Sequence, residues 1–439
     1  MSKVHLLSLG CPKNLVDSGH LLKKLGERGL CYCSDPDDAD IVLVNTCGFI
    51  EEAKRESVEE ILRLARYKGR EGRKLVVFGC LAERYAAELT REIPEIDALW
   101  GVDKMDDILE YCSQNAGLRG RTMKGEKFAD TAYAYLKIAE GCDRSCSYCA
   151  IPRIRGAYRS RKPEEILAEA EAHVKAGRRE LILIAQDITS YGLDFNGYDL
   201  SRLVREITAL DGDFWVRLLY LYPSSINDNL LETVASEEKV CNYIDVPLQH
   251  SERRILKLMG RGGSRSLYEK MIRRIREVIP DVSVRTSLIV GFPGEREEDF
   301  QGMLKFVGKM KFDRLGAFMY SREEGTAAYG LEGHLPRRVK ERRYGRLMEL
   351  QSAISAEANE KLVGRTFRAL VDEVDRGVAV ARTFSQAPEI DGVVFIEDPK
   401  VKKGTFVNVE IKEAYDYDLK GVVVRDGGGR PGRNAERVL

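Results

Sequence analysis

The chain has 439 residues, too many for one ordinary hydrophobic core, which predicts two or three domains. Lys and Arg number 70, as do Asp and Glu, so the zero net charge excludes a globally basic nucleic-acid-binding protein, though not a local basic patch. No apolar run approaches the ~20 residues that span a bilayer, and the N-terminus has no secretory signal, so we expect a cytoplasmic protein. In a reducing compartment the ten cysteines indicate metal ligation rather than disulfides.

Residues 1–125 alternate short apolar runs with amphipathic segments, which predicts an α/β domain with a parallel sheet. We expect strands at Val4–Leu9, Ile41–Val44 and Leu75–Phe78, and helices at Leu15–Leu25, Glu51–Leu64 and Glu83–Glu92. This arrangement resembles a flavodoxin-like domain. A polar link with several glycines, Gly117–Asp130, marks its expected end.

Residues 126–336 repeat the alternation of strand and helix six times. The strand candidates are Ala134–Ile138, Leu181–Ile184, Val216–Leu221, Tyr243–Val246, Ser283–Val290 and Arg314–Met319. Six units are too few for a closed eight-stranded barrel, so we expect a curved, partial TIM-like barrel.

The pattern changes after Pro336. A charged helix is expected at Arg337–Leu362, so that residues 337–363 link the barrel to a last domain at 364–425. Five short β-branched runs punctuated by Gly and Pro predict a small antiparallel β-barrel there. The polar tail, residues 426–439, is expected to be disordered.

Three cysteines follow the first barrel strand with the spacing C-x3-C-x2-C: Cys142, Cys146 and Cys149. Three thiolates on one loop can hold three irons of a [4Fe–4S] cluster and leave the fourth iron open. An open iron can be chelated by S-adenosylmethionine (SAM), and reduction can then release a 5′-deoxyadenosyl radical. A structural zinc loop is the alternative, but zinc needs a fourth ligand and the loop supplies no further Cys or His.

Four other residues are candidate SAM contacts, because each lies near the end of a predicted strand that faces the same pocket. They are Tyr148, Gln186, Arg285 and Gly291. Gly291 belongs to a two-glycine turn after the fifth barrel strand, where backbone can approach a ligand closely. We assign no general acid or base.

A second set of cysteines is dispersed in sequence but regular in placement. Cys11, Cys47 and Cys80 each come within three residues after a predicted strand of the N-terminal sheet. The carboxyl ends of parallel strands meet at one edge of a sheet, so these thiolates predict a second [4Fe–4S] cluster. Three unrelated buried cysteines are the alternative. The remaining four cysteines are interpreted as packing residues.

These features together resemble the radical-SAM methylthiotransferases, from Val4 to Val424. The resemblance implies that the barrel cluster generates a radical, that the second cluster carries or relays sulfur, and that the last domain is a substrate-binding TRAM domain. It also implies SAM as both radical source and methyl donor, an electron donor, and a possible external sulfur donor.

One branch of this family modifies the β-carbon of an aspartate in small-subunit ribosomal protein S-twelve, and another modifies adenosine in tRNA. Five segments resemble the first branch: Ser8–Ser18, Asn45–Ile50, Ala185–Gly192, Tyr320–Thr326 and Ala414–Leu419. Residues 364–424 carry nine Lys and Arg against eleven Asp and Glu, which favours a basic protein partner over RNA.

Two alternatives stay open. Methylthiolation of tRNA adenosine is one, and a non-catalytic iron–sulfur protein that binds ribosomes is the other. The second would not cleave SAM. A basic run after the barrel cysteines, residues 153–162, is interpreted either as a solvated face or as a contact for an aspartate carboxylate or ribosomal RNA.

Overall fold

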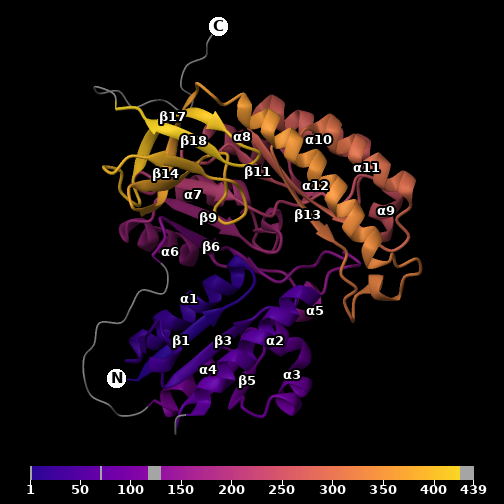
Figure 1. Ribbon diagram of the computed structural model, residues 1–439. Helices are drawn as coiled ribbons and strands as arrows, with labels where there is room; N and C mark the ends of the chain where they lie inside the picture. Colours follow the sequence, from indigo (N-terminus) through magenta and orange to yellow (C-terminus); the bar gives the residue numbers. More distant parts are fainter. Residues whose placement is uncertain (1, 70–71, 117–129, 426–439) are drawn as a thin grey trace.

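The structure is a computed structural model that describes residues 2–69, 72–116 and 130–425. Nearly all of the expected link, residues 117–129, and the whole of the expected tail lie outside the described residues. Figure 1 shows an N-terminal α/β sheet, a central barrel of strands and helices, and a small C-terminal β-barrel. The N-terminal sheet and the C-terminal barrel lie on different sides of the central barrel.

The N-terminal sheet is parallel throughout, with strand order β2-β1-β3-β4-β5. This is the flavodoxin-like order, which confirms the predicted fold class. The strands are β1 (Lys3–Ser8), β2 (Cys31–Tyr32), β3 (Ile41–Thr46), β4 (Lys74–Gly79) and β5 (Ala98–Trp100). The helices are α1 (Pro12–Glu27), α2 (Glu51–Ala65), α3 (Cys80–Glu92) and α4 (Met105–Gln114).

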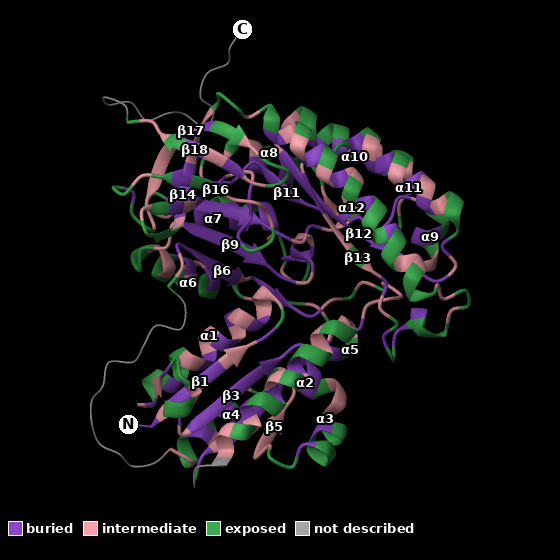
Figure 2. Cartoon of the chain, viewed as in Figure 1, coloured by how far each residue is buried: buried purple, intermediate pink, exposed green. Residues whose placement is uncertain are grey.

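Helices cover both faces of this sheet, which explains why its central strands are apolar without alternation. Val42 and Val44 pack with side chains of α2 and α3, whereas Ile41 and Leu43 pack with side chains of α1 and α4. Strand β3 is buried at every position, as the purple ribbon in Figure 2 shows. A sheet buried on both faces leaves its strand ends as the place for functional groups.

The central barrel is an open arc of parallel strands in two three-stranded sheets, β6-β9-β10 and β11-β12-β13. Its strands are β6 (Tyr133–Lys137), β9 (Glu180–Ile184), β10 (Trp215–Leu218), β11 (Tyr243–Asp245), β12 (Ser283–Val290) and β13 (Arg314–Met319). Five helices alternate with them: α6 (Pro163–Lys175), α7 (Leu200–Thr208), α8 (Asp228–Ser236), α10 (Arg265–Val278) and α11 (Glu297–Met310). The partial TIM-like barrel is confirmed.

Shorter elements follow β6: β7 (Ala139–Glu140), α5 (Ile151–Arg155) and β8 (Arg159–Ser160), with α9 (Arg253–Leu258) farther along the chain. After the barrel, α12 (Arg337–Glu360) crosses its outer surface toward the C-terminal barrel (Figure 1). In the described part of the chain no helix, α12 included, is long and apolar enough to cross a membrane.

The C-terminal barrel is closed, in the order β14-β15-β16-β18-β17. Its strands are β14 (Thr366–Asp375), β15 (Val378–Thr383), β16 (Val394–Glu397), β17 (Phe406–Ala414) and β18 (Leu419–Val423). The β16–β18 pair is parallel and the other four pairs are antiparallel. The sequence predicts an antiparallel barrel, and one pair differs. Strands can alternate in direction all the way around a closed ring only if their number is even, so a ring of five must contain at least one parallel pair.

The C-terminal barrel reaches into the central barrel through the 384–391 loop, which follows β15. The Tyr133 hydroxyl donates to Glu389 Oε1 at 2.7 Å, and the Tyr243 hydroxyl donates to Asp391 Oδ2 at 2.6 Å. Tyr133 and Tyr243 begin β6 and β11, so the loop covers the amino-terminal end of the barrel strands. The opposite, carboxyl-terminal end is left for chemistry.

A buried ion-pair cluster fixes this docking. Glu180 is fully buried between Arg217, whose Nε lies 2.6 Å from Glu180 Oε1, and Arg382, whose Nη1 lies 2.7 Å from Glu180 Oε2. Arg382 also holds Asp372 at 2.6 and 2.9 Å. Because a buried charge without a partner is strongly destabilising, each of these groups depends on the others.

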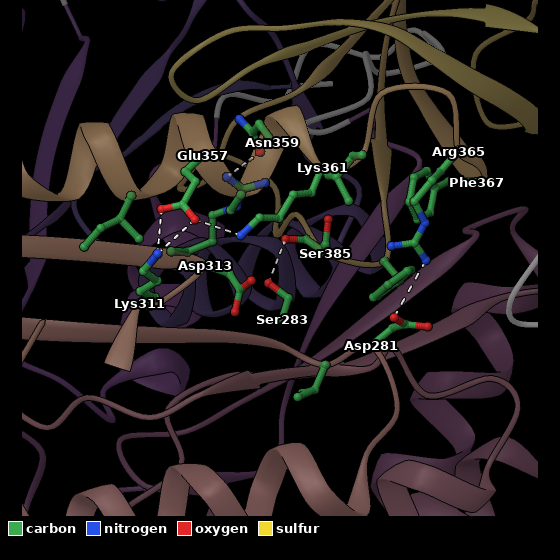
Figure 3. A pocket seen from close by; sticks show the side chains of 16 residues that line it. Asp281, Ser283, Lys311, Asp313, Glu357, Asn359, Lys361, Arg365, Phe367 and Ser385 are labelled. Atoms are coloured by element: carbon green, nitrogen blue, oxygen red, sulfur yellow. Dashed lines mark hydrogen bonds and ion pairs between the residues drawn. The ribbon is translucent and has the colours of Figure 1, made fainter. Parts of the chain in front are cut away.

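A pocket of about 310 Å³ lies where α12, the starts of β12 and β13 and the C-terminal barrel meet (Figure 3). Glu357 holds Lys311 at 2.7 Å and Lys361 at 2.9 Å, and Arg365 lies 3.7 Å from Asp281. These charges pair with one another, and the pocket lining includes no cysteine. The pocket is therefore separate from the site that the sequence predicts.

Candidate iron–sulfur and SAM site

The barrel cysteines lie on the loop after β7, at the carboxyl-terminal end of the barrel strands. Backbone hydrogen bonds fix this loop: the Cys142 N–H donates to the Gly156 carbonyl, and the Cys149 N–H donates to the Cys146 carbonyl, both at 3.1 Å. All three cysteines are half-buried, and none forms a disulfide. The loop therefore holds three thiols together at the open mouth of the barrel.

Electrostatics of this loop fit a metal group. Burial raises the pKa of Cys142 and raises that of Cys149 to about 12, and Cys146 raises both further. Deprotonation of such crowded thiols is favourable only with a cation present. Arg261 Nη1 lies 3.5 Å from Cys146 Sγ and adds one positive charge.

The structure also bears on the zinc alternative. No three Cys, His, Asp or Glu side chains among residues 2–69, 72–116 and 130–425 are placed to hold a single metal ion. The loop from Cys142 to Cys149 supplies three thiols and no further Cys or His, so this donor set fits a cluster with one open iron better than a four-coordinate zinc site.

The second set of cysteines converges at the carboxyl edge of the N-terminal sheet, after the neighbouring strands β1, β3 and β4. Cys11 caps α1, Cys47 follows β3 and Cys80 begins α3. Gly10 has φ +87°, and a Cβ there would lie 2.7 Å from Cys47 Sγ. Only glycine lets the chain before Cys11 pass so close to that thiol.

These three thiols interact with one another. Burial raises the pKa of Cys47 to about 12, and Cys11 and Cys80 add to the rise. Burial also raises the pKa of Cys80, with Arg155 opposing and Cys11 adding to it. The mutual repulsion of their anionic forms is what a shared metal cluster would relieve, so this set also fits a cluster.

Arg155 joins the two cysteine sets. Its guanidinium is 4% exposed and donates to Asp17 Oδ2 and Glu140 Oε2 at 2.9 Å and to Asn14 Oδ1 at 2.6 Å. Its Nη2 also lies 3.5 Å from Cys80 Sγ. Asp17, Asn14 and Cys80 belong to the N-terminal domain, whereas Glu140 lies two residues before the first barrel cysteine. One side chain thus spans the boundary between the two sites.

Gln186, a candidate SAM contact, lies beside this network. Its Nε2 donates to Glu140 Oε1 at 2.9 Å, and its own Oε1 is buried without a hydrogen-bond partner in the described part of the chain. Burial alone would raise the pKa of Glu140, but Lys137 and Arg155 outweigh burial and lower it to about 2. The unused acceptor of Gln186 next to a fixed carboxylate is suited to a polar ligand.

Tyr148 lies inside the cysteine loop. Its hydroxyl is 3.5 Å from Arg261 Nη1, and its ring meets Phe292 edge to face with centroids 6.5 Å apart. Burial raises the pKa of Tyr148 well above its ordinary value. The neutral phenol is therefore fixed beside Cys146, and its contact with SAM stays a prediction.

The other two candidate SAM contacts already have partners within the chain. Arg285 Nη1 donates to Asp245 Oδ1 at 2.9 Å, and its Nε lies 3.5 Å from Asp391 Oδ1 of the C-terminal barrel. Gly291 has φ +75°, and a Cβ there would lie 2.5 Å from Lys340 Cγ on α12. Whether Arg285 or Gly291 touches SAM also stays a prediction.

Two tyrosines that the sequence did not single out lie between the cysteine sets, just after β10. The Lys13 ammonium lies 3.6 Å from the centroid of the Tyr220 ring. The guanidinium carbons of Arg144 and Arg261 lie 3.9 and 4.4 Å from the centroid of the Tyr222 ring. Aromatic residues directly after a barrel strand are the signal that could have found them.

The basic run at 153–162 is largely used within the chain. Besides the buried Arg155, Arg159 pairs with Asp103 at 2.6 Å and Arg161 pairs with Glu169 at 2.7 Å. These contacts join the barrel to the N-terminal domain and to α6. Arg153 and Lys162, the other two basic residues of the run, are exposed and form no ion pair within the described part of the chain, so their contact with a substrate stays a prediction.

Three family models match the chain. The uncharacterized protein family UPF0004 matches residues 3–101, the radical SAM superfamily matches residues 136–307, and the TRAM domain matches residues 363–424. Among solved structures, the radical SAM methyltransferase TsrM from Kitasatospora setae has a similar fold, with TM-score 0.55 and 14% identity over 87% of this chain and 81% of that chain. Fold and site together define a radical-SAM enzyme, which implies SAM and a [4Fe–4S] cluster as cofactors.

Curated relatives give a finer assignment. The "Ribosomal protein uS12 methylthiotransferase RimO" of Thermodesulfovibrio yellowstonii is 51% identical over 97% of this chain and 100% of its own length. The protein of the same name from Acetivibrio thermocellus is 45% identical over 97% of this chain and 99% of its own length. That from Geobacter sulfurreducens is also 45% identical, over 96% of this chain and 98% of its own length. The chain belongs to the RimO family of radical-SAM methylthiotransferases.

Proposed function

We propose that this protein adds a methylthio group to the β-carbon of an aspartate in ribosomal protein uS12. The observation that carries the proposal is the similarity to uS12 methylthiotransferases at 42–51% identity over at least 96% of the chain. Ribosomal proteins of the small subunit are cytoplasmic, so we propose the same location for this chain. The domain limits expected from the sequence, 1–125, 126–336, 337–363 and 364–425, are part of this proposal.

We assign the cofactor sites to the two cysteine sets. Cys142, Cys146 and Cys149 would hold a [4Fe–4S] cluster that binds SAM, and Cys11, Cys47 and Cys80 would hold a second cluster. When bound, these groups supply a radical that removes a hydrogen atom from the substrate carbon, together with the sulfur and the methyl group that replace it. An electron donor and, in one version of the proposal, an external sulfur donor act with the protein.

The residues of the chain prepare the site for these groups. Gln186 offers a free acceptor and Tyr148 a neutral phenol, both suited to the polar parts of SAM. Arg144 is fixed by Asp187 at 2.8 Å, and both Arg144 and Arg261 lie against the Tyr222 ring near the barrel cysteines. Arg155 keeps the N-terminal domain closed on the barrel, so that both cysteine sets can act on one carbon.

Mass spectrometry of uS12 and of tRNA from cells with and without this protein tests the proposal. We expect the methylthio group on a uS12 aspartate to disappear when the protein is removed, and tRNA methylthioadenosine to remain. Loss of the tRNA modification alone would contradict the proposal and favour the tRNA alternative. Absence of 5′-deoxyadenosine from the reduced, reconstituted protein would instead favour a non-catalytic iron–sulfur protein.

A further inference from the structure

Lys13 has an unmatched charge close to the second cysteine set. It lies two residues after Cys11 and is half-buried, with its ammonium 3.6 Å from the centroid of the Tyr220 ring. An aromatic face attracts a cation, but it does not accept hydrogen bonds from the ammonium N–H groups in the way that a carboxylate does. Within the described ranges, no carboxylate comes within 4.0 Å of this ammonium, so its donors are available to a ligand.

The other cations around the site are already used. Carboxylates hold four of them. Asp17 and Glu140 pair with both Lys137 and Arg155, Asp187 pairs with Arg144, and Asp245 pairs with Arg285. Arg261 donates to the Pro247 carbonyl at 2.8 Å and lies against Cys146. Among these cations, Lys13 can bind an anion without breaking an ion pair. Arg261 would have to move away from Cys146 to do so.

The ring beneath Lys13 is held in a costly conformation. Tyr220 has φ +68°, a backbone region that bulky side chains rarely adopt because it is strained. The Tyr220 N–H donates to Asp245 Oδ2 at 2.9 Å, and Arg285 holds the other oxygen of Asp245. Strain maintained in this way is typical of a binding or catalytic site.

This segment also spans the distance between the two cysteine sets. Tyr220 lies under Lys13, which is two residues after Cys11. Tyr222 lies against Arg261, whose Nη1 is 3.5 Å from Cys146 Sγ. One end of the segment therefore faces the N-terminal cysteines and the other faces the barrel cysteines. A substrate carbon held beside this segment would be near both cysteine sets.

We propose that Lys13 binds the side-chain carboxylate of the substrate aspartate and so places its β-carbon between the two cysteine sets. The inference rests on the proposed function. The β-carbon is bonded directly to the carboxylate carbon, so an anchor for the carboxylate also positions the reacting atom. Adenine has no carboxylate, and Lys13 would therefore contribute to the choice of a protein substrate.

The test compares binding of uS12 with binding of its Asp→Asn form at the modified position. The full-length protein is reconstituted with iron, sulfide and SAM, and affinity is measured without reductant, so that no turnover occurs. Lys13→Met removes the charge but keeps an apolar stem over Tyr220, and Lys13→Gln is a second neutral variant should Met disturb the site. Lys13→Arg keeps the charge. Lys23→Met, at an exposed position of the same helix, is the matched control.

We expect the wild-type protein to bind the Asp form about tenfold more tightly than the Asn form, equivalent to about 1.4 kcal/mol. The neutral variants should lose this preference while keeping SAM cleavage, and Lys13→Arg and Lys23→Met should retain it. Full retention of the preference in a neutral variant that still cleaves SAM would overturn the role of Lys13 alone. Failure of the wild type to bind or modify uS12 would overturn the proposed function and, with it, this inference.

Discussion

The guanidinium of Arg155 lies 3.5 Å from the sulfur of Cys80, although 75 residues separate them in the chain. Arg155 comes six residues after the last barrel cysteine, and Cys80 belongs to the N-terminal set. A cationic donor at this distance stabilises negative charge on a thiolate. The loop of one cysteine set therefore influences the electrostatics of the other.

Replacement of Arg155 by Met should lower the reduction potential of the second cluster. Reduction adds negative charge, and hydrogen bonds to cluster sulfurs stabilise the reduced form. One charge-assisted bond of about 1.4 kcal/mol corresponds to about 60 mV for a one-electron couple. Potentiometric titration followed by electron paramagnetic resonance would measure the shift.

Arg153→Met is the matched control, because Arg153 lies on the same short helix α5 but is exposed. It should leave both potentials unchanged. Arg155→Met should also leave the reduction potential of the barrel cluster within experimental error of its value in the wild-type protein. Equal potentials for the second cluster in both variants would show that Arg155 has only a structural role.

Replacement of Cys11, Cys47 and Cys80 together by Ala should separate the two cysteine sets by function. The variant should bind about half of the wild-type iron, because one four-iron cluster remains of two. It should still form 5′-deoxyadenosine but no methylthio product, because the sulfur source is lost. Iron analysis and chromatography of the reaction products would measure these outcomes.

The same triple variant distinguishes two further possibilities. A purely structural metal site would show itself as lost folding stability, because metal binding contributes folding free energy. A well-folded triple variant that still makes methylthiolated product would contradict the sulfur role. Full iron content would show that these cysteines are not ligands.

Replacement of Cys146 by Ala should abolish SAM cleavage while leaving the N-terminal cysteines in place. Cys146 is the middle ligand of the proposed barrel cluster and contacts Arg261. Without it the cluster has two protein ligands, too few to keep one iron open for SAM. Formation of 5′-deoxyadenosine under strong reductant is the measurement, and Cys241→Ala, at a buried cysteine outside both sets, is the control. A wild-type rate in Cys146→Ala would refute the assignment.

Much of the fold could be predicted because local patterns coincide with it. The apolar run of β3 and the position of Cys47 directly after it are both visible in sequence, and a parallel sheet then brings such cysteines together. Strand β5 was not predicted, because three residues at a sheet edge carry no periodicity, whereas the alternation of Cys31 and Cys33 does indicate the short strand β2. The parallel pair in the C-terminal barrel follows from ring closure, which strand patterns do not reveal.

The contacts that join the domains could not be predicted. The positive φ of Tyr220, the hydroxyl of Tyr133 on Glu389 and the position of Arg285 between Asp245 and Asp391 all depend on residues far apart in sequence. Single-residue patterns carry no information about such pairs. The structure adds a link from Arg285 to the C-terminal barrel, and its contact with SAM stays a prediction.

Replacement of Arg382 by Met should weaken the docking of the C-terminal barrel. It would leave Glu180, at 0% exposure, with Arg217 alone and would leave Asp372 without its ion pair. Loss of one partner from a buried cluster costs about 3 kcal/mol. With a urea dependence of about 2 kcal/mol per M, the transition should move to lower urea by about 1–2 M.

Trp215 provides the signal for this measurement. It is buried and meets Phe406 of the C-terminal barrel with ring centroids 4.8 Å apart, so its fluorescence should change when the two barrels separate. The chain has 2 tryptophans, and a Trp100→Phe background leaves Trp215 as the sole reporter. Lys403→Met is the control: its pair with Asp130, at 3.3 Å, is exposed and worth about 1 kcal/mol or less. If the Arg382 and Lys403 variants unfold at the same urea concentration, the buried cluster does not hold the barrels together.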